Sequence, residues 1–148
     1  MVINKRDGKY MYDINKILSI LPHRYPFVFV DKILSLEKDK VYGIKNLAYN
    51  EPYFQGHIPS KPVFPGVYMI EALAQLGGVI LYSSNKQDIF YLAKVEKTRF
   101  KKVLVPGDQL HLYIEMTRSR SNIFQFSGRI EVDGALAMDT EICLALER

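Results

Sequence analysis

The sequence predicts an α+β fold in which one long apolar helix is wrapped by a strongly curved antiparallel sheet. Residues 65–81 form the most apolar stretch of the chain and have helix-like spacing, and β-like segments precede and follow them. A helix that is apolar on most sides must be covered nearly all round, which a curved sheet achieves and a flat sheet does not. We expect residues 1–148 to form a single domain.

The elements before this helix are short. Asp13 can cap a first helix whose apolar residues recur on one face, and Pro22 would end it. Strand-forming residues then occupy positions 27–36. A polar turn at 37–40 leads into a second predicted strand near 41–48.

A long loop is expected between the second strand and the apolar helix. Residues 50–65 contain four prolines and Gly56, so this segment should have little regular structure of its own. Loops of this length inside a compact domain are usually functional. Pro65 suits the first turn of the following helix, where a missing amide proton costs nothing.

The rest of the chain predicts long antiparallel strands. Asp133-Gly134 is a strong signal for a tight hairpin between the last two of them. The edge of such a sheet stays open, so edge-to-edge pairing into a homodimer is expected. The predicted strands lie near 89–103, 110–119, 123–132 and 136–146.

Composition narrows the class of protein. With 48% hydrophobic and 24% charged residues, the chain is globular rather than disordered. We identify no signal peptide and no stretch long enough to span a membrane, and the single cysteine, Cys143, cannot form an internal disulfide, so a cytoplasmic protein without membrane association is expected. The three histidines show no metal-ligand spacing. Nucleic acid is a poor candidate partner, because the aromatic residues are not interleaved with the basic ones.

Two ionisable residues stand out as candidates for proton-transfer chemistry. His57 lies in the turn-rich loop, and Glu71 lies in the middle of the apolar helix, where a carboxyl rarely sits without a partner or a task. Histidine supplies a neutral base near neutral pH, and desolvation should favour the protonated form of Glu71. A base and an acid are what β-elimination next to a carbonyl requires. Free amides at the helix start near Gly66 could stabilise the enolate oxygen.

Four segments carry a resemblance to a known family. They are LPHRYPF (21–27), NEPYFQGHIP (50–59), KPVFPGV (61–67) and EALAQ (71–75). These segments closely resemble the FabZ type of (3R)-hydroxyacyl-acyl carrier protein dehydratases of bacterial fatty acid synthesis, and the resemblance extends over essentially the whole chain. It implies the hotdog fold, in which an antiparallel sheet wraps a long helix. Ile58 and Ser60 depart from the family, which usually has phenylalanine and glycine or asparagine there.

The resemblance implies roles for individual residues. The family's catalytic histidine and glutamate fall on His57 and Glu71, which would meet across a dimer interface, and such dimers commonly assemble into a trimer of dimers. Gly66 and Val67 would bind the substrate carbonyl, with Gly66 supplying the oxyanion amide. An aromatic gate to the acyl tunnel falls on Phe90 or its neighbour Tyr91. No cofactor or metal is implied. The related dehydratase-isomerase type has aspartate at the position of Glu71, so dehydration without isomerisation is expected.

The implied substrate is tethered to a small acidic acyl carrier protein, which gives the basic residues of this chain a use. Arg99, Lys101 and Lys102, with Lys61 or Lys97 nearby, are the predicted docking residues. We interpret His23 and Arg24 as structural residues that hold the loop before the first strand. Two alternatives stay open: thioester hydrolysis, in which Glu71 activates water, and a non-catalytic acyl-binding module. Release of free thiol would mark the first, and tolerance to loss of His57 and Glu71 the second.

Overall fold

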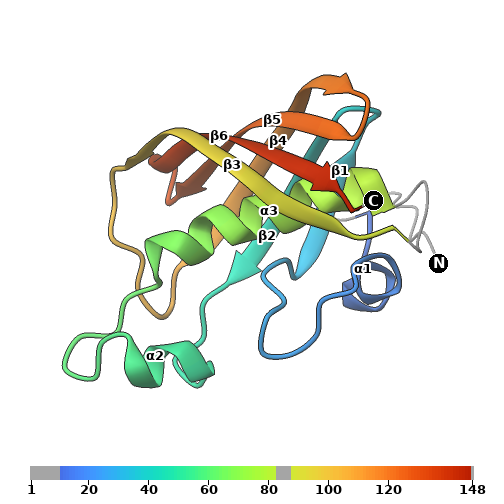
Figure 1. Ribbon diagram of the computed structural model, residues 1–148. Helices are drawn as coiled ribbons and strands as arrows, with labels where there is room; N and C mark the ends of the chain where they lie inside the picture. The colour runs from blue at the N-terminus through green and yellow to red at the C-terminus, as the bar shows by residue number, and fades with distance from the viewer. Residues whose placement is uncertain (1–10, 83–87, 148) are drawn as a thin grey trace.

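The computed structural model describes residues 11–82 and 88–147. A 17-residue helix, α3, runs along the concave face of one six-stranded antiparallel sheet (Figure 1). This confirms the predicted α+β architecture and is the arrangement of the hotdog fold. The elements in chain order are α1 (Ile14–Ile20), β1 (Lys32–Leu36), β2 (Lys40–Asn46), α2 (Pro52–Gly56), α3 (Gly66–Tyr82), β3 (Phe90–Phe100), β4 (Gln109–Arg120), β5 (Ile123–Val132) and β6 (Ala135–Leu146).

The core lies between α3 and the sheet. The strand order is β1-β2-β4-β5-β6-β3, and α3 packs against every strand except β1. Leu73, Leu76 and Val79 of α3 are completely buried. Because most sides of α3 are covered, burial of its apolar residues contributes about 1.5–3 kcal/mol per large side chain. The helix therefore gives a rigid support to any side chain that it carries.

The hairpin and helix-cap predictions are confirmed. Asp133 and Gly134, with φ of 52° and 76°, form the tight turn between β5 and β6. The Asp13 side chain accepts a hydrogen bond from the Lys16 amide at the start of α1. β5 has the predicted bounds, whereas β3 ends three residues before the predicted 103.

Two predictions about segments that precede α3 in the chain are wrong. The first strand begins at Lys32 rather than at 27, because the amide of Phe29 donates to the Gln75 side chain and not to a neighbouring strand. The loop 50–65 contains a short helix, α2, with Pro52 in its first turn. Phe54 is buried and anchors this helix to the core. The fixed backbone angle of proline is compatible with a helix start, so a proline-rich segment need not lack helix.

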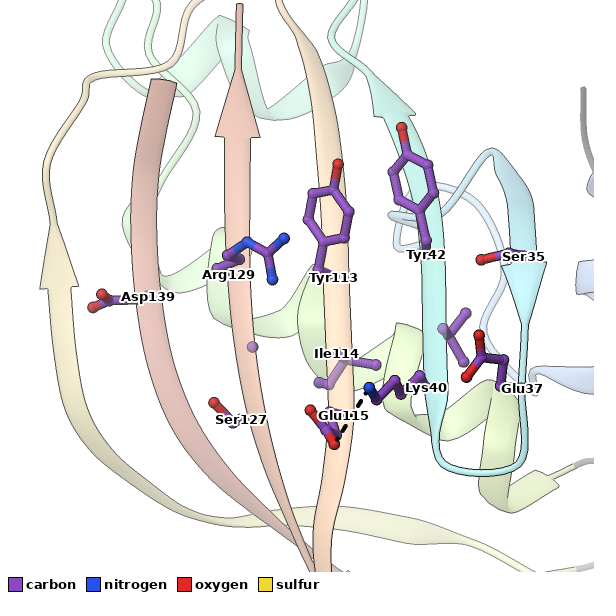
Figure 2. Close-up of a pocket in the computed structure, with 12 residues that line it drawn as sticks. Ser35, Glu37, Lys40, Tyr42, Tyr113, Ile114, Glu115, Ser127, Arg129 and Asp139 are labelled. Atoms are coloured by element: carbon purple, nitrogen blue, oxygen red, sulfur yellow. Dashed lines mark ion pairs between the residues drawn. The ribbon is translucent and has the colours of Figure 1, made fainter. Parts of the chain in front are cut away.

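The outer face of the sheet, away from α3, carries a ladder of polar and aromatic side chains (Figure 2). The rings of Tyr42 and Tyr113 stack with centroids 4.5 Å apart, and the Arg129 guanidinium lies 4.0 Å from the Tyr113 ring centroid. Desolvation and a hydrogen bond with Tyr42 raise the pKa of Tyr113 to about 12. The groove here, about 580 Å³ in volume, is lined by neither His57 nor Glu71. Its cross-strand pairs stabilise the sheet.

Candidate active site

The first turn of α3 presents free backbone donors. The amides of Tyr68 and Met69 donate to the Pro65 carbonyl, whereas those of Gly66 and Val67 donate to no described residue. Val67 is 68% exposed, so this end of the helix is open to a ligand. Unpaired amides and the positive end of the helix dipole favour a developing negative charge.

Gly66 lacks a side chain at a crowded position. A Cβ placed there would lie 3.1 Å from the ring of Phe100, which is tighter than ordinary van der Waals contact. Phe100 is the last residue of β3 and is half exposed. The ring and the amide of Gly66 therefore form one surface, and only glycine leaves that surface undisturbed.

The loop after α2 holds His57 in a defined state. The Val63 amide donates to the His57 carbonyl at 3.0 Å, and His57 Nδ1 lies 2.9 Å from the Val63 carbonyl oxygen. A carbonyl can only accept, so Nδ1 must carry the proton. In the neutral imidazole the lone pair is then on Nε2, which has no hydrogen-bond partner among the described residues. His57 is thereby prepared to act as a base through Nε2.

Glu71 lies in the second turn of α3 with its side chain 22% exposed. Burial raises the pKa of this carboxyl, and a hydrogen bond from Gln75 opposes the rise. The burial effect is the larger, which favours the protonated acid more than water would. The expectation of a desolvated carboxyl on an apolar helix is confirmed.

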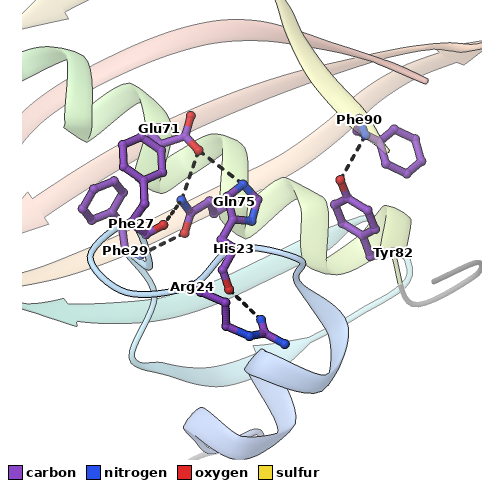
Figure 3. Close-up of polar contacts among 8 residues, drawn as sticks. All are labelled: His23, Arg24, Phe27, Phe29, Glu71, Gln75, Tyr82 and Phe90. Atoms are coloured by element: carbon purple, nitrogen blue, oxygen red, sulfur yellow. Dashed lines mark hydrogen bonds and ion pairs between the residues drawn. The ribbon is translucent and has the colours of Figure 1, made fainter. Parts of the chain in front are cut away.

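Gln75 fixes both the loop before β1 and the carboxyl of Glu71 (Figure 3). Its Oε1 accepts from the Phe29 amide at 2.9 Å, which identifies Nε2 as the amide nitrogen. Nε2 donates to the Phe27 carbonyl at 2.9 Å and to Glu71 Oε1 at 3.0 Å. Because a carbonyl oxygen accepts more strongly than a carboxylic hydroxyl, the hydrogen bond to Oε1 favours Oε2 as the oxygen that carries the proton when this carboxyl is protonated. Gln75 is 1% exposed, and its spacing four residues after Glu71 is the sequence signal that could have identified it.

His23 and Arg24 hold the segment between α1 and β1. The Arg24 guanidinium donates to the carbonyls of Leu18, Leu21 and His23. This agrees with the structural role expected of Arg24. His23 does more than the sequence indicates, because its Nε2 lies 3.6 Å from Glu71 Oε1.

Within one chain, His57 and Glu71 form no hydrogen bond or ion pair with each other. The polar contacts of Glu71 are Gln75 and His23, and His57 contacts Val63. A catalytic pair made of these two residues therefore needs a second copy of the chain or a substrate between them.

The candidate gate residues face different surroundings. The Phe90 ring packs edge-on against Tyr82 at 5.0 Å and Phe124 at 5.7 Å between centroids. Tyr91 is 54% exposed, and its hydroxyl donates to Glu147. Phe90 thus packs near the end of α3, whereas the side chain of Tyr91 lies at the surface.

The predicted docking residues differ in how their charges are paired. Arg99 makes a two-pronged contact with Asp139 at 3.2 and 2.8 Å. Lys102 lies 3.8 Å from Asp133, and Lys97 lies 3.6 Å from Glu141. By contrast, Lys101 is exposed and forms no ion pair with a described residue, and the same holds for Lys61 in the loop after α2.

The described part of the chain has neither a cluster of metal ligands nor a membrane-spanning helix. Among residues 11–82 and 88–147, no three His, Cys, Asp or Glu side chains come together as metal ligands. None of the described helices has the length and apolarity needed to cross a bilayer.

Comparisons with known proteins agree on one family. A family model described as a FabA-like domain matches residues 21–141. The chain is 44% identical over 138 residues to the 3-hydroxyacyl-(acyl-carrier-protein) dehydratase FabZ of Shewanella woodyi, covering 90% of this chain and 91% of that protein. It is 42% identical over 139 residues to the same-named protein of Sorangium cellulosum, covering 90% of each.

Solved structures support the fold. The dehydratase heterocomplex ApeI:P from Xenorhabdus doucetiae contains a chain that superposes with a TM-score of 0.78 at 16% identity, over 89% of this chain and 91% of that one. A hypothetical thioesterase from Streptococcus pneumoniae superposes with a TM-score of 0.61 at 12% identity, over 78% of this chain and 84% of that one. At such identities the likeness concerns the fold alone.

Proposed function

The chain belongs to the FabA-like family, and we propose that it is a hydro-lyase of fatty acid biosynthesis that dehydrates 3-hydroxyacyl thioesters carried on acyl carrier protein. The 44% identity to a FabZ dehydratase extends over nine tenths of the chain and includes the segments around His57 and Glu71. The observation that carries the proposal is that the hydrogen bonds of His57 suit it to accept a proton, whereas the surroundings of Glu71 suit it to give one. Neutral His57 has its lone pair on Nε2, and the hydrogen bond to Oε1 of Glu71 favours Oε2 as the oxygen that carries the acidic proton.

The elimination then proceeds through these two atoms. His57 Nε2 removes a proton from the carbon next to the thioester carbonyl, and the electron pair moves toward the carbonyl oxygen. The Gly66 and Val67 amides stabilise the negative charge on that oxygen. Glu71 Oε2 gives its proton to the departing hydroxyl, which leaves as water, and the electrons form the new double bond. Burial of Glu71 favours the protonated form that this step needs.

We propose that the two side chains come from opposite protomers of a homodimer. Among the described strands, β3 lies at the edge of the sheet and pairs only with β6, and no described residue pairs with its outer edge. Exposed long apolar edges invite pairing with a second chain. Assembly of such dimers into a trimer of dimers is the further proposal, and a solution mass measurement tests it. The exposed apolar residues in and beside β3 are Ile89, Tyr91, Leu92, Val95 and Phe100, at 40–54% exposure.

The acidic carrier is proposed to dock near the start of α3. Of the predicted docking residues, Lys101 and Lys61 form no ion pair with a described residue, whereas Arg99 and Lys102 are engaged by Asp139 and Asp133. The structure thus favours a larger contribution from Lys101 with Lys61 than from Arg99 with Lys102. Electrostatic attraction of this kind mainly accelerates encounter. The cytoplasm is the proposed compartment.

The docking proposal is tested by charge reversal. Lys61→Glu combined with Lys101→Glu should raise KM for carrier-bound substrate much more than for a small soluble thioester. Lys38→Glu and Lys40→Glu together are the matched control, because both lysines are exposed at the β1–β2 turn. Equal effects on both substrates, or an equal effect of the control, would contradict the docking site.

The gate proposal assigns the acyl-tunnel gate to Phe90, whose ring packs on the aromatic residues near the end of α3. Phe90→Ala should change the relative rates on short and long acyl chains, while Tyr91→Ala, which removes a surface hydrogen bond to Glu147, should not. The reverse outcome would move the gate to Tyr91.

One assay separates dehydration from thioester hydrolysis. The protein is incubated with a crotonyl thioester while the conjugated enoyl absorbance and free thiol are followed together. Loss of the enoyl absorbance without thiol is expected, because hydration is the reverse of the proposed reaction. Appearance of thiol would instead indicate a thioesterase. No change in either, with acyl ligand bound, would indicate a binding module.

A further inference from the structure

The imidazole of His23 and the amide of Gln75 converge on the same oxygen of Glu71 (Figure 3). Gln75 Nε2 is 3.0 Å and His23 Nε2 is 3.6 Å from Oε1. Oε2 accepts no hydrogen bond from any described residue and points away from both nitrogens in the figure. One oxygen is therefore held by the protein, and the other is left for chemistry.

The surroundings of His23 define its tautomer. Nδ1 is buried and has no hydrogen-bond partner among residues 11–82 and 88–147. A buried N–H without an acceptor is costly, and a lone pair on Nε2 would face Oε1 of Glu71, which already accepts a hydrogen bond from Gln75. Both penalties are avoided when Nδ1 carries the lone pair and Nε2 carries the proton. Burial, and next the nearby Arg24 cation, lower the pKa of His23 and so favour this neutral form.

We propose that His23 is a positioning residue for Glu71: its neutral Nε2–H, together with Gln75, holds Oε1 as an acceptor and keeps the acidic proton on Oε2. This deepens the proposed function and rests on it. The distance of 3.6 Å exceeds a normal hydrogen bond, and contacts of this kind commonly tighten when substrate binds.

Among the described residues, few charged or titratable groups lie near His23 and Glu71. Arg24 lies next to His23 in the chain, and its guanidinium is tied to three carbonyls. Tyr82, farther along α3, has its pKa raised by burial first and in smaller part by Asp88 and Glu71. In the proposed dimer, the His57 imidazole of a second protomer completes the set. No strand contributes a charged group to the causes that shift the pKa of Glu71 or of His23.

The first experiment uses the unmodified protein. Long-range proton–nitrogen NMR of the histidine rings, assigned with His23→Gln, reports which nitrogen of each ring is protonated. We expect His23 to be neutral with its proton on Nε2 near neutral pH, and His57 to carry its proton on Nδ1. A His23 ring protonated on Nδ1 alone, or on both nitrogens at neutral pH, would overturn the proposal.

The second experiment compares His23→Leu with His23→Gln. Leucine fills similar space without a donor, whereas glutamine can place an N–H near the position of Nε2. We expect His23→Leu to lower kcat by about 10- to 100-fold with a smaller change in KM, because misplacing a catalytic group by about 1 Å can cost about 100-fold in rate. His23→Gln should restore most of kcat. His111→Leu, on the outer face beside Tyr42, is the matched control and should keep full activity.

A spectroscopic readout separates positioning from loop stability. The carbonyl stretch of the protonated Glu71 carboxyl, identified by its loss in Glu71→Gln, is followed against pH in folded protein. Removing a donor from Oε1 disfavours the anion, so the midpoint in His23→Leu should move to higher pH, and in His23→Gln it should stay near that of the unmodified protein. An unmoved midpoint in His23→Leu, or loss of kcat that glutamine does not restore, would reject the role. These outcomes differ from failure of the proposed function, which would appear as retained dehydration in Glu71→Gln.

Discussion

At the scale of single residues, Glu71 combines a catalytic use with a cost to stability. Burial raises its pKa in the folded protein above the ordinary value of 4.5. A group whose pKa is raised by folding makes its full contribution to the stability of the fold at a pH below its unfolded pKa. This stabilisation is lost as the pH rises through the folded pKa. Glu71 therefore makes the fold less stable at neutral pH than at acidic pH.

Glu71→Gln should stabilise the protein at neutral pH while it removes dehydratase activity. The amide keeps an oxygen for Gln75 and carries no charge, so we expect a gain of about 0.5–2 kcal/mol at pH 7.5. The gain should shrink as the pH falls toward about 4, because the Glu71 carboxyl is then largely protonated in both the folded and the unfolded protein. Thermal unfolding at both pH values measures it, with the exposed Glu37→Gln as control. A gain that is the same at both pH values would mean that the carboxyl charge is not its source.

Two glycines of neighbouring segments differ in the space around them. A Cβ on Gly66 would press on the Phe100 ring, whereas a Cβ on Gly56 would meet nothing within 4 Å. Gly66→Ala should therefore displace the ring or the amide and lower kcat/KM by at least about tenfold, because oxyanion donors must be accurately placed. Gly56→Ala should leave kcat/KM unchanged. Steady-state kinetics on a crotonyl thioester compares them, and equal effects would show that the crowding at Gly66 is irrelevant.

At the scale of elements, α3 holds the loop before β1 through one buried side chain. Gln75 uses its oxygen for the Phe29 amide and its nitrogen for the Phe27 carbonyl, so this loop runs beside the helix without joining the sheet. The aromatic side chains of Phe27 and Phe29 lie edge-on to each other, with centroids 4.8 Å apart. The loop and the catalytic carboxyl are thus positioned by the same residue.

Gln75→Leu should destabilise the protein by about 1–3 kcal/mol, because it leaves the buried Phe29 amide without a partner. The Phe27 carbonyl also loses its partner but lies in an exposed residue, where water can replace the hydrogen bond. Gln125→Leu, on the half-buried outer part of β5, serves as the control. Urea unfolding followed by circular dichroism gives both free energies. A loss below about 1 kcal/mol for Gln75→Leu would show that water or a rearranged loop satisfies these groups.

These elements also show what the sequence could predict. Local patterns identified α3, β5 and the Asp133-Gly134 turn, because hydrophobic period and turn chemistry act over a few residues. They placed the first strand five residues too early, because its start depends on Gln75, 46 positions from Phe29. The contact of His23 with Glu71 was missed for the same reason. The roles of His57 and Glu71 were expected from residue chemistry and family resemblance, and they stay proposals.

At the scale of the whole molecule, the central question is where the proposed site is completed. His57 is tied to Val63 in the loop after α2, and Glu71 is tied to Gln75 in α3. The open edge of β3 offers a surface through which a second chain could bring its histidine to this carboxyl. If the site is shared between two protomers, mixing two inactive variants should restore a fixed fraction of the activity. A site within one chain predicts no such recovery.

Mixing His57→Ala with Glu71→Gln should restore activity that neither variant has alone. Each variant should lose at least about 100-fold in kcat. In a mixed dimer with shared sites, one site combines both defects and the other has neither. Random pairing makes about half of the dimers mixed, so co-expression should give about a quarter of the activity of the unmodified protein. Sites within one chain would stay inactive, because every chain carries a defect.

The double variant, His57→Ala with Glu71→Gln, provides the matched control for this experiment. Co-expressed with unmodified chain, it leaves both sites of a mixed dimer defective when sites are shared, so about a quarter of full activity should remain. Sites within one chain would give about a half, because every unmodified chain would stay active. Two differently tagged copies, purified through both tags in sequence, isolate the mixed dimers when the dimers are kept from assembling further. These should have half of full activity in the first mixture and almost none in the second, and the opposite pattern would place His57 and Glu71 in the same chain's site.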